Sequence, residues 1–190
     1  MYSSIKAGLR PVIRYMLYVV AALLLTAATL VVLAWLPAPA EPVRNENAVE
    51  IARSPDTVFS FTTTPSTWPK WHPATLSVEG VTQRTPRVGE QVTEDYRSGG
   101  VLNRTRWTVV EHNSPRRWRI EGRGKFGEQA SITYSFVPTP NGTRFERELE
   151  YRMPNRLAAW LELLIRRRVA DESALALRQL KSVLEASTPG

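Results

Sequence analysis

The chain has 190 residues, of which 43% are hydrophobic and 23% charged, and these values are ordinary for one folded domain plus a short extra segment. It contains no cysteine, which excludes disulfide bonds and thiolate chemistry. The formal net charge of +7 falls to +4 without Lys6, Arg10 and Arg14, which is too little to indicate a nucleic-acid partner.

The first expected element is an apolar helix over residues 15–36. It carries no charged residue, and Thr26 and Thr29 are its only clearly polar side chains. At roughly 1.5 Å per residue it is about 33 Å long, close to the hydrocarbon thickness of a bilayer. The sequence therefore predicts one transmembrane anchor, with residues 1–14 forming a short segment on its cytoplasmic side.

Two features bear on the fate and the orientation of this helix. Ala38-Pro39-Ala40 resembles a cleavage site, but the apolar run is longer than that of a signal peptide, and the proline would hinder cleavage. We therefore expect the anchor to be retained. All three basic residues before the helix lack acidic neighbours, so the N-terminus is expected in the cytoplasm. The domain would then lie outside the cell membrane, in the periplasm if the host is bacterial.

A soluble domain is expected over residues 48–190, after a proline-rich, polar linker over residues 37–47. The domain opens with an alternating strand over residues 48–53. Ser54-Pro55-Asp56 then supplies the cap, first-turn proline and early acid of a helix start. An aromatic-rich turn over residues 67–73 follows that helix.

Six further strands are expected, because segments rich in β-formers alternate with turns that contain glycine, proline or asparagine. Their connections are short, which predicts an antiparallel meander. The expected strands cover residues 76–81, 88–97, 101–111, 117–122, 130–137 and 142–152.

The chain ends with apolar residues at three- and four-residue steps, which predicts one long helix over residues 155–186 with its apolar face on the sheet. The basic run over residues 166–168 is expected on a solvated face, and contact with anionic lipid headgroups is the alternative. The order of elements predicts an α+β domain. A curved antiparallel sheet would wrap around the long C-terminal helix and leave a cavity between them.

Strand parity predicts which side chains point into that cavity. On the strand over residues 142–152, apolar residues alternate with charged ones, so the face that contains Phe145 and Arg147 is the inner one. The same reasoning assigns an inward direction to Val88, Glu90, Val92, Glu94, Tyr96, Trp107, Val109, Trp118, Ile120, Ile132, Tyr134 and Phe136.

Arg147 is the most informative of these residues. With Glu94, Tyr96 and Tyr134 it would form a polar cluster that orients a ligand carbonyl or carboxylate, since a desolvated arginine needs a partner. The alternative is that Arg147 reaches the sheet edge or is turned outward by a bulge. Trp71 is expected to line the cavity mouth or to anchor the core, and the neighbouring histidine is expected to be a surface turn residue.

Several segments, in this order along the chain, carry a family resemblance. They are residues 49–59, Trp68-Pro69-Lys70-Trp71-His72-Pro73, Val88-Gly89-Glu90, Pro115-Arg116-Arg117-Trp118 and Asn141-Gly142-Thr143-Arg144-Phe145. Their order and spacing resemble the START-like (SRPBCC) superfamily, specifically its polyketide cyclase/dehydrase-like branch. The resemblance covers residues 49–185 and implies a helix-grip fold around a pocket for lipids, polyketides or other apolar small molecules. The anchor helix lies outside the family pattern.

We therefore expect a membrane-tethered binding domain that holds a hydrophobic small molecule or lipid, without a cofactor and without nucleic acid. His72 and His112 have no acid or cysteine at ligand spacing, so no metal site is expected. The expected ligand-binding residues are Trp71, Glu94, Tyr96, Trp107, Trp118, Tyr134, Phe145 and Arg147.

Two other functions stay open. One is a polyketide cyclase/dehydrase-like enzyme, in which Glu94, Tyr96, Tyr134 or His72 would have to act as acid or base. The other is a protein-interaction module with a collapsed pocket, which a core filled with bulky aromatic side chains would favour.

Overall fold

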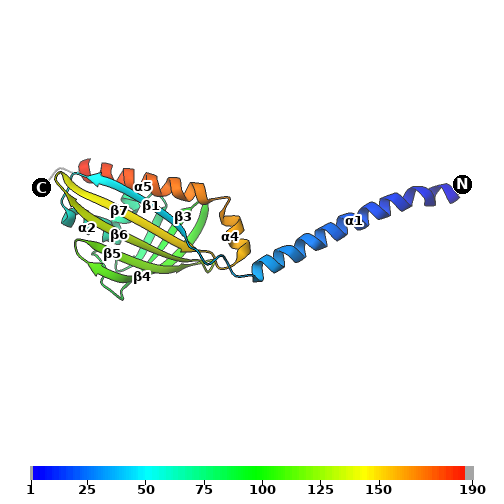
Figure 1. The fold of residues 1–190 in the computed structure, drawn as a ribbon, viewed down its shortest axis with the longest axis horizontal. Coiled ribbons are helices and arrows are strands. Elements are labelled where there is room, and N and C mark those ends of the chain that lie inside the picture. Colours follow the sequence, from blue (N-terminus) through cyan, green and yellow to red (C-terminus); the bar gives the residue numbers. More distant parts are fainter. Residues whose placement is uncertain (1, 187–190) are drawn as a thin grey trace.

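The N-terminal helix α1, Tyr2–Trp35, projects away from the rest of the molecule in the computed structural model, which describes residues 2–186 (Figure 1). Its segment Pro11–Trp35 is long and apolar enough to cross a membrane, and the rest of the chain buries none of it. A signal sequence near the N-terminus shares these properties. The apolar helix predicted over residues 15–36 is thus present, and it starts earlier than predicted.

Seven strands form one antiparallel sheet in the order β1-β7-β6-β5-β4-β3-β2. Strands β2 to β7 form the predicted meander, and β1 pairs with β7 along its full length, from Val43 opposite Tyr151 to Ile51 opposite Thr143. The strands are β1 Val43–Ile51, β2 Thr75–Gly80, β3 Gln91–Ser98, β4 Val101–Asn113, β5 Arg117–Gly124, β6 Gln129–Thr139 and β7 Gly142–Arg152.

Helices α2, α3 and α5 cover one face of this curved sheet, whereas α4 lies at its end (Figure 1). The longest, α5, packs against β1, β3 and α3, which is the helix-grip arrangement that the sequence predicts (Figure 1). Helix α2 begins where predicted, because the Ser54 hydroxyl accepts a hydrogen bond from the Thr57 amide. The helices are α2 Pro55–Thr63, the 3-10 turn η1 Pro65–Thr67, α3 Trp68–Trp71, α4 Arg156–Glu162 and α5 Arg166–Ala186.

Strand β1 begins at Val43, so the prediction of a linker up to residue 47 is wrong for residues 43–47. The strand alternates between half-buried and exposed positions from Val43 to Glu50 and ends on the buried Ile51. Its first half-buried positions include Asn45 and Asn47, so the alternation of burial does not coincide with an alternation of hydrophobicity. Pairing with β7 stabilises this part of the strand, and the local sequence pattern does not reveal that pairing.

The single C-terminal helix predicted over residues 155–186 is divided into α4 and α5 by a turn at residues 163–165. Within the turn, the amide of Ile165 donates to the carbonyl oxygen of Glu162 at 2.9 Å. No glycine or proline marks the break, so helical periodicity continues through it. The prediction that the entire apolar face packs on the sheet is therefore wrong for α4, where Trp160 and Leu161 are exposed.

Strand β3 begins at Gln91, so the predicted inward direction of Val88 and Glu90 is wrong. Gly89, with φ of +87°, closes a turn that leaves the Val88 side chain exposed. The Glu90 carboxylate lies outside the core and pairs with the Arg84 guanidinium at 2.6 Å. Hydrogen bonds from Arg84 and from the Arg87 amide lower the pKa of Glu90 to about 2.

Candidate functional site

The inner face of the sheet carries a cluster of large buried side chains. Parity correctly predicts its main members, because each strand turns alternate residues toward α5. The buried residues from the predicted inward set are Val92, Glu94, Trp107, Val109, Trp118, Ile120, Ile132, Tyr134, Phe136, Phe145 and Arg147, and Tyr96 is half-buried.

Arg147 is only 4% exposed, which excludes the alternative that it reaches the sheet edge or turns outward. It lies opposite Tyr134 in the register of β6 and β7. One guanidinium nitrogen, Nη1, donates to the Ser173 hydroxyl on α5, whereas the buried Nε atom finds no hydrogen-bond partner in the described part of the chain. Among residues 2–186, no carboxylate forms an ion pair with this arginine.

Glu94 lies on β3 and is buried with both carboxyl oxygens occupied. Oε1 accepts from the Thr75 hydroxyl at 2.6 Å, and Oε2 accepts from the Trp107 indole N–H at 2.8 Å. Burial raises the pKa of Glu94, and this effect exceeds the opposing effects of the two hydrogen bonds and of the Arg147 charge. The side chain is thus close enough to Arg147 to feel its charge, but its direct partners are neutral.

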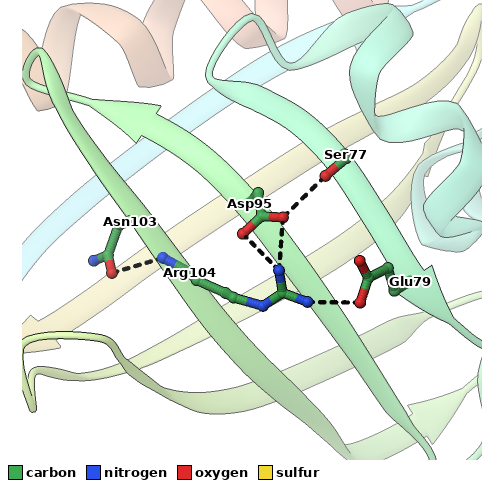
Figure 2. A network of polar contacts seen from close by, with 5 residues as sticks. All are labelled: Ser77, Glu79, Asp95, Asn103 and Arg104. Atoms are coloured by element: carbon green, nitrogen blue, oxygen red, sulfur yellow. Dashed lines mark hydrogen bonds and ion pairs between the residues drawn. The ribbon is translucent and has the colours of Figure 1, made fainter.

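The next residue on β3, Asp95, faces the opposite side of the sheet, as the period of two requires. Figure 2 shows its carboxylate between Ser77 on β2 and Arg104 on β4. Arg104 also pairs with Glu79 at 2.6 Å. This exposed network holds the edge strand β2, whereas Glu94 belongs to the interior.

Tyr96 does not join Arg147, so the predicted four-residue cluster is divided. Its hydroxyl lies 3.2 Å from the Thr105 hydroxyl and accepts from the Asn103 amide at 3.1 Å. The same Asn103 amide donates to Glu128, next to the β5–β6 turn. Burial raises the pKa of Tyr96 to about 12, so its hydroxyl stays protonated at neutral pH.

Four aromatic rings surround the Arg147 side of the core. Trp118 stacks on Tyr134 with 5.6 Å between ring centroids, and Tyr134 meets Phe145 edge-on at 5.2 Å. Trp71 from α3 contacts both Tyr134 and Phe145, at 6.3 and 6.5 Å. The predicted residues from α3, β5, β6 and β7 therefore meet in one place.

Around these aromatic rings, several buried polar side-chain atoms have no hydrogen-bond partner among the described residues. Of six such side-chain atoms among the described residues, four lie around these rings: Trp71 Nε1, Trp118 Nε1, His72 Nδ1 and Arg147 Nε. Buried polar groups in proteins are nearly always hydrogen-bonded, so four together are unusual. Three of them are donors whatever the pH, because two are indoles and one is a guanidinium.

His72 is not the surface turn residue that the sequence suggests. It is half-buried and meets Trp71 edge-on with 5.5 Å between ring centroids. Burial, with a smaller contribution from the Arg147 charge, lowers the pKa of His72 to about 3. The ring is therefore neutral at physiological pH, and its buried Nδ1 faces the interior as either donor or acceptor.

The large aromatic side chains of the site are tightly packed, and the two surface hollows lie elsewhere. Two hollows of about 480 and 550 Å³ lie on the outer face, lined by polar residues such as Thr108, Glu121 and Arg123. Trp71, Trp118 and Phe145 are each at most 1% exposed. Residues 2–186 contain no group of three histidine, cysteine or acidic side chains that could hold a metal ion.

Sequence reasoning missed the two hydroxyl partners in this region. Thr75 begins β2 one residue before the predicted strand, and Ser173 lies on α5. Ser173 precedes Ala176, Leu177 and Leu180 by three, four and seven residues, so it shares their apolar face. A small polar residue on such a face was the available signal that α5 contributes to the polar site.

Comparison with known proteins places this geometry in a family. Residues 42–185 match the family described as polyketide cyclase / dehydrase and lipid transport. None of the curated proteins compared with the chain matches it.

Solved structures share the fold at low sequence identity. A protein from Rhodobacter sphaeroides is 21% identical, with 79% of this chain and 95% of that chain covered and a TM-score of 0.60. A START superfamily protein from Mycobacterium smegmatis is 18% identical, with 75% and 97% covered and the same TM-score. The di-domain ARO/CYC StfQ of the steffimycin biosynthetic pathway is 18% identical, with 76% and 52% covered and a TM-score of 0.59.

Proposed function

The chain belongs to the polyketide cyclase/dehydrase and lipid transport family, and on that premise we propose that its domain binds an apolar small molecule or lipid between sheet and α5. The ligand would carry a hydrogen-bond acceptor, either a carbonyl or a carboxylate. The retained anchor α1 would keep the domain beside a membrane.

The observation that carries this proposal is the group of unpartnered donors around Tyr134. Leaving a buried donor without a partner costs about 1–3 kcal/mol, so Trp71 Nε1, Trp118 Nε1 and Arg147 Nε together would destabilise the core as long as no ligand is bound. A single ligand oxygen accepts two or more hydrogen bonds. A carboxylate would also compensate the Arg147 charge, which no ion pair within residues 2–186 neutralises.

Binding requires the filled core to open. The rings that would make room are Trp71, on the four-residue helix α3, and Trp118, which is stacked on Tyr134. An apolar ligand body would replace their contacts and contribute about 25 cal/mol for each Å² that it buries. The acceptor group would fix its orientation, as in most small-molecule sites.

The membrane part of the proposal rests on α1 and its flanks. The segment Pro11–Trp35 is apolar apart from Arg14, and Lys6 and Arg10 precede it. We infer a single pass, with the N-terminus in the cytoplasm and the domain on the extracytoplasmic side, which is the periplasm in a bacterial host. Only seven residues separate Trp35 from β1, so the domain would stay close to the bilayer.

Native mass spectrometry of the full chain in nanodiscs, challenged with a whole-cell lipid extract, tests the binding proposal. We expect a discrete bound mass on the wild type and its loss in Arg147→Met. Arg104→Met, which removes an exposed arginine from the network of Figure 2, is the matched control and should keep the bound mass. Absence of any bound species from folded wild type would overturn the proposal.

An enzyme of the cyclase/dehydrase type is the second candidate, and Glu94 favours it. A buried carboxyl group with a raised pKa is a common acid or base in catalysis. Both of its oxygens, however, are already bonded to Thr75 and Trp107. A substrate would have to displace one of them, so binding without chemistry accounts for the geometry more simply.

The third candidate is an interaction module, which the filled aromatic core favours. Such a module would fold around Trp118, Tyr134 and Phe145 and never admit a ligand. An interaction module gives no role to the unpartnered donors. In that case Arg147→Met would raise the free energy of unfolding, and no bound species would be lost because none would bind to the wild type. The mass-spectrometric comparison therefore distinguishes the two.

A further inference from the structure

Four large apolar side chains are exposed together on α4 and the turn that follows it. Leu164 is 73% exposed, and its neighbours are exposed by about half or more of their surface. Scattered exposed apolar residues need no explanation, but a contiguous set on one short element does. We name this set the α4 patch, and it consists of Trp160, Leu161, Leu163 and Leu164.

The patch points outward because the opposite side of α4 is fastened to the sheet. Glu162 is buried, and its carboxylate accepts from the Tyr151 hydroxyl and from Arg166 Nη2, both at 2.6 Å. At about 100° per residue, the four apolar residues spread over the side opposite Glu162. The contacts of Glu162 therefore fix the orientation of α4 so that these four apolar side chains face the solvent.

The patch lies where the apolar helix α1 leaves the domain. The amide of Arg156, the first residue of α4, donates to the carbonyl oxygen of Leu36 at 3.0 Å, and α1 packs against α4. Figure 1 shows α4 at the end of the sheet from which α1 departs. Whatever surface receives α1 is therefore adjacent to the patch.

Neighbouring elements extend this surface and give it a basic rim. The β5–β6 turn carries exposed Phe126 and Lys125, and its Gly127 lies beside Pro154, just before α4. The β3–β4 turn touches the other end, since Gly99 abuts Ile165. The exposed basic residues along this rim are Lys125, Arg156, Arg167 and Arg168.

We propose that the α4 patch enters the interfacial layer of the same bilayer that holds α1, with the basic rim against anionic headgroups. Apolar side chains flanked by arginine and lysine are the pattern of elements that lie in a membrane surface, and tryptophan favours that layer. The proposal rests on the tether of the proposed function and is independent of any ligand in the core.

The absence of cysteine makes a site-specific test possible. Leu164→Cys, Leu23→Cys and Val137→Cys variants of the full chain would carry an environment-sensitive fluorophore in vesicles of mixed phosphatidylcholine and phosphatidylglycerol. Leu23 reports the middle of α1. Val137 is the matched exposed control, because it lies eight residues along β6 from the α4 end, about 26 Å at roughly 3.3 Å per residue.

Quenching by spin-labelled lipids gives the readout. We expect the Leu23 and Leu164 labels to be quenched, the latter about twofold or more above the Val137 label. Quenching at Leu23 with none at Leu164 would overturn the docking proposal and leave the tether intact. No quenching at Leu23 would remove the tether and the docking proposal together, without bearing on ligand binding.

Two further outcomes separate the alternatives. A Leu164 label that is shielded from lipid in proportion to protein density would show that a second copy covers the patch, which overturns the proposal. Combined Arg167→Gln and Arg168→Gln substitution should reduce Leu164 quenching in anionic vesicles toward its value in pure phosphatidylcholine. Equal quenching with and without these charges would refute the headgroup contact.

Discussion

At the scale of single residues, the core contains indole groups that differ in one respect. Trp68 Nε1 donates to the Thr62 carbonyl oxygen at 3.0 Å, and Trp107 Nε1 donates to Glu94 at 2.8 Å. Trp71 Nε1 and Trp118 Nε1 are also buried, and neither has an acceptor among the residues that the structure describes. The two pairs of tryptophans differ in whether the indole N–H has an acceptor. Substitution by phenylalanine removes the N–H and part of the ring, so its effect on the free energy of unfolding measures this difference.

A first prediction follows for Trp118→Phe and its control Trp68→Phe. Both remove a similar amount of ring, but only Trp68→Phe leaves a buried carbonyl, that of Thr62, without its partner. We expect Trp68→Phe to lower the free energy of unfolding by about 1 kcal/mol more than Trp118→Phe does. Chemical denaturation followed by circular dichroism measures both, and equal losses would contradict the account of Trp118.

A second prediction concerns Glu94→Gln and pH. Because burial raises the pKa of Glu94, the folded state retains a proton that the unfolded chain releases above about pH 4.5. This carboxyl group therefore lowers stability progressively as pH rises from that value through its folded pKa. Glutamine can still accept from Trp107 and can donate to Thr75, but it does not ionise.

The variant should therefore match the wild type near pH 4 and exceed it in free energy of unfolding at pH 8. His72 acts in the opposite direction, since its pKa of about 3 removes stability as pH falls below 6.5. That contribution is common to both proteins and cancels in their difference. A difference that does not grow with pH would show that Glu94 is charged in the folded state.

At the scale of elements, the sequence predicts a strand or helix correctly where the pattern of hydrophobicity along the chain matches the pattern of burial. Strand β7 has the predicted bounds, because its apolar and charged residues alternate as its inner and outer positions do. The strand predicted from the sequence is shorter than β1, because Asn45 and Asn47 occupy half-buried positions of β1. The sequence does not predict the break between α4 and α5, because no helix-breaking residue marks it; Ile165, at the break, lies against Gly99.

A third prediction tests that junction with two glycines. A Cβ at Gly99 would lie 2.9 Å from the Ile165 Cβ atom, whereas a Cβ at Gly89 would meet open space. Both have positive φ, so alanine costs roughly 1–2 kcal/mol of backbone strain at either position. Gly99→Ala should be the less stable in thermal unfolding, and equal stabilities would mean that the β3–β4 turn does not pack on the junction.

The candidate site can be predicted only in part, because the sequence pattern gives the direction of a side chain but not its hydrogen-bond partner. Parity and composition place Arg147 and the aromatic residues on one inner face. Whether a buried donor meets an acceptor depends on the positions of α3 and α5 relative to the sheet, as the Arg147–Ser173 hydrogen bond illustrates. Tyr96 shares the parity of Glu94 but bonds to Asn103, a partner that parity alone does not reveal.

At the scale of the whole molecule, the anchor, the α4 patch and the core site form one arrangement. The apolar helix leaves the domain beside α4, and α5 leads from that end along the sheet to the Ser173–Arg147 contact. An apolar ligand that partitions into a bilayer would be concentrated near this end. This arrangement would suit the proposed binding domain, held close to a membrane by α1.

A fourth prediction concerns topology. Alkaline phosphatase fused after residue 190 should be active in a bacterial host, since the basic residues that precede the uncharged stretch of α1 would keep the N-terminus in the cytoplasm. Reversing the flank with Lys6→Glu, Arg10→Glu and Arg14→Glu should reduce this activity. An inactive phosphatase fusion together with a fluorescent cytoplasmic reporter at the same position would invert the proposed orientation.

The central claim is that the unpartnered donors form the polar end of a ligand site, and the indole N–H resonances of the full chain in nanodiscs test it most directly. On addition of whole-cell lipid extract, the Trp71 and Trp118 signals should shift downfield as they gain an acceptor. The Trp68 and Trp107 signals already have acceptors in Thr62 and Glu94, so they should stay in place. If none of the four moves while a bound mass is present, the ligand lies elsewhere and the claim is wrong.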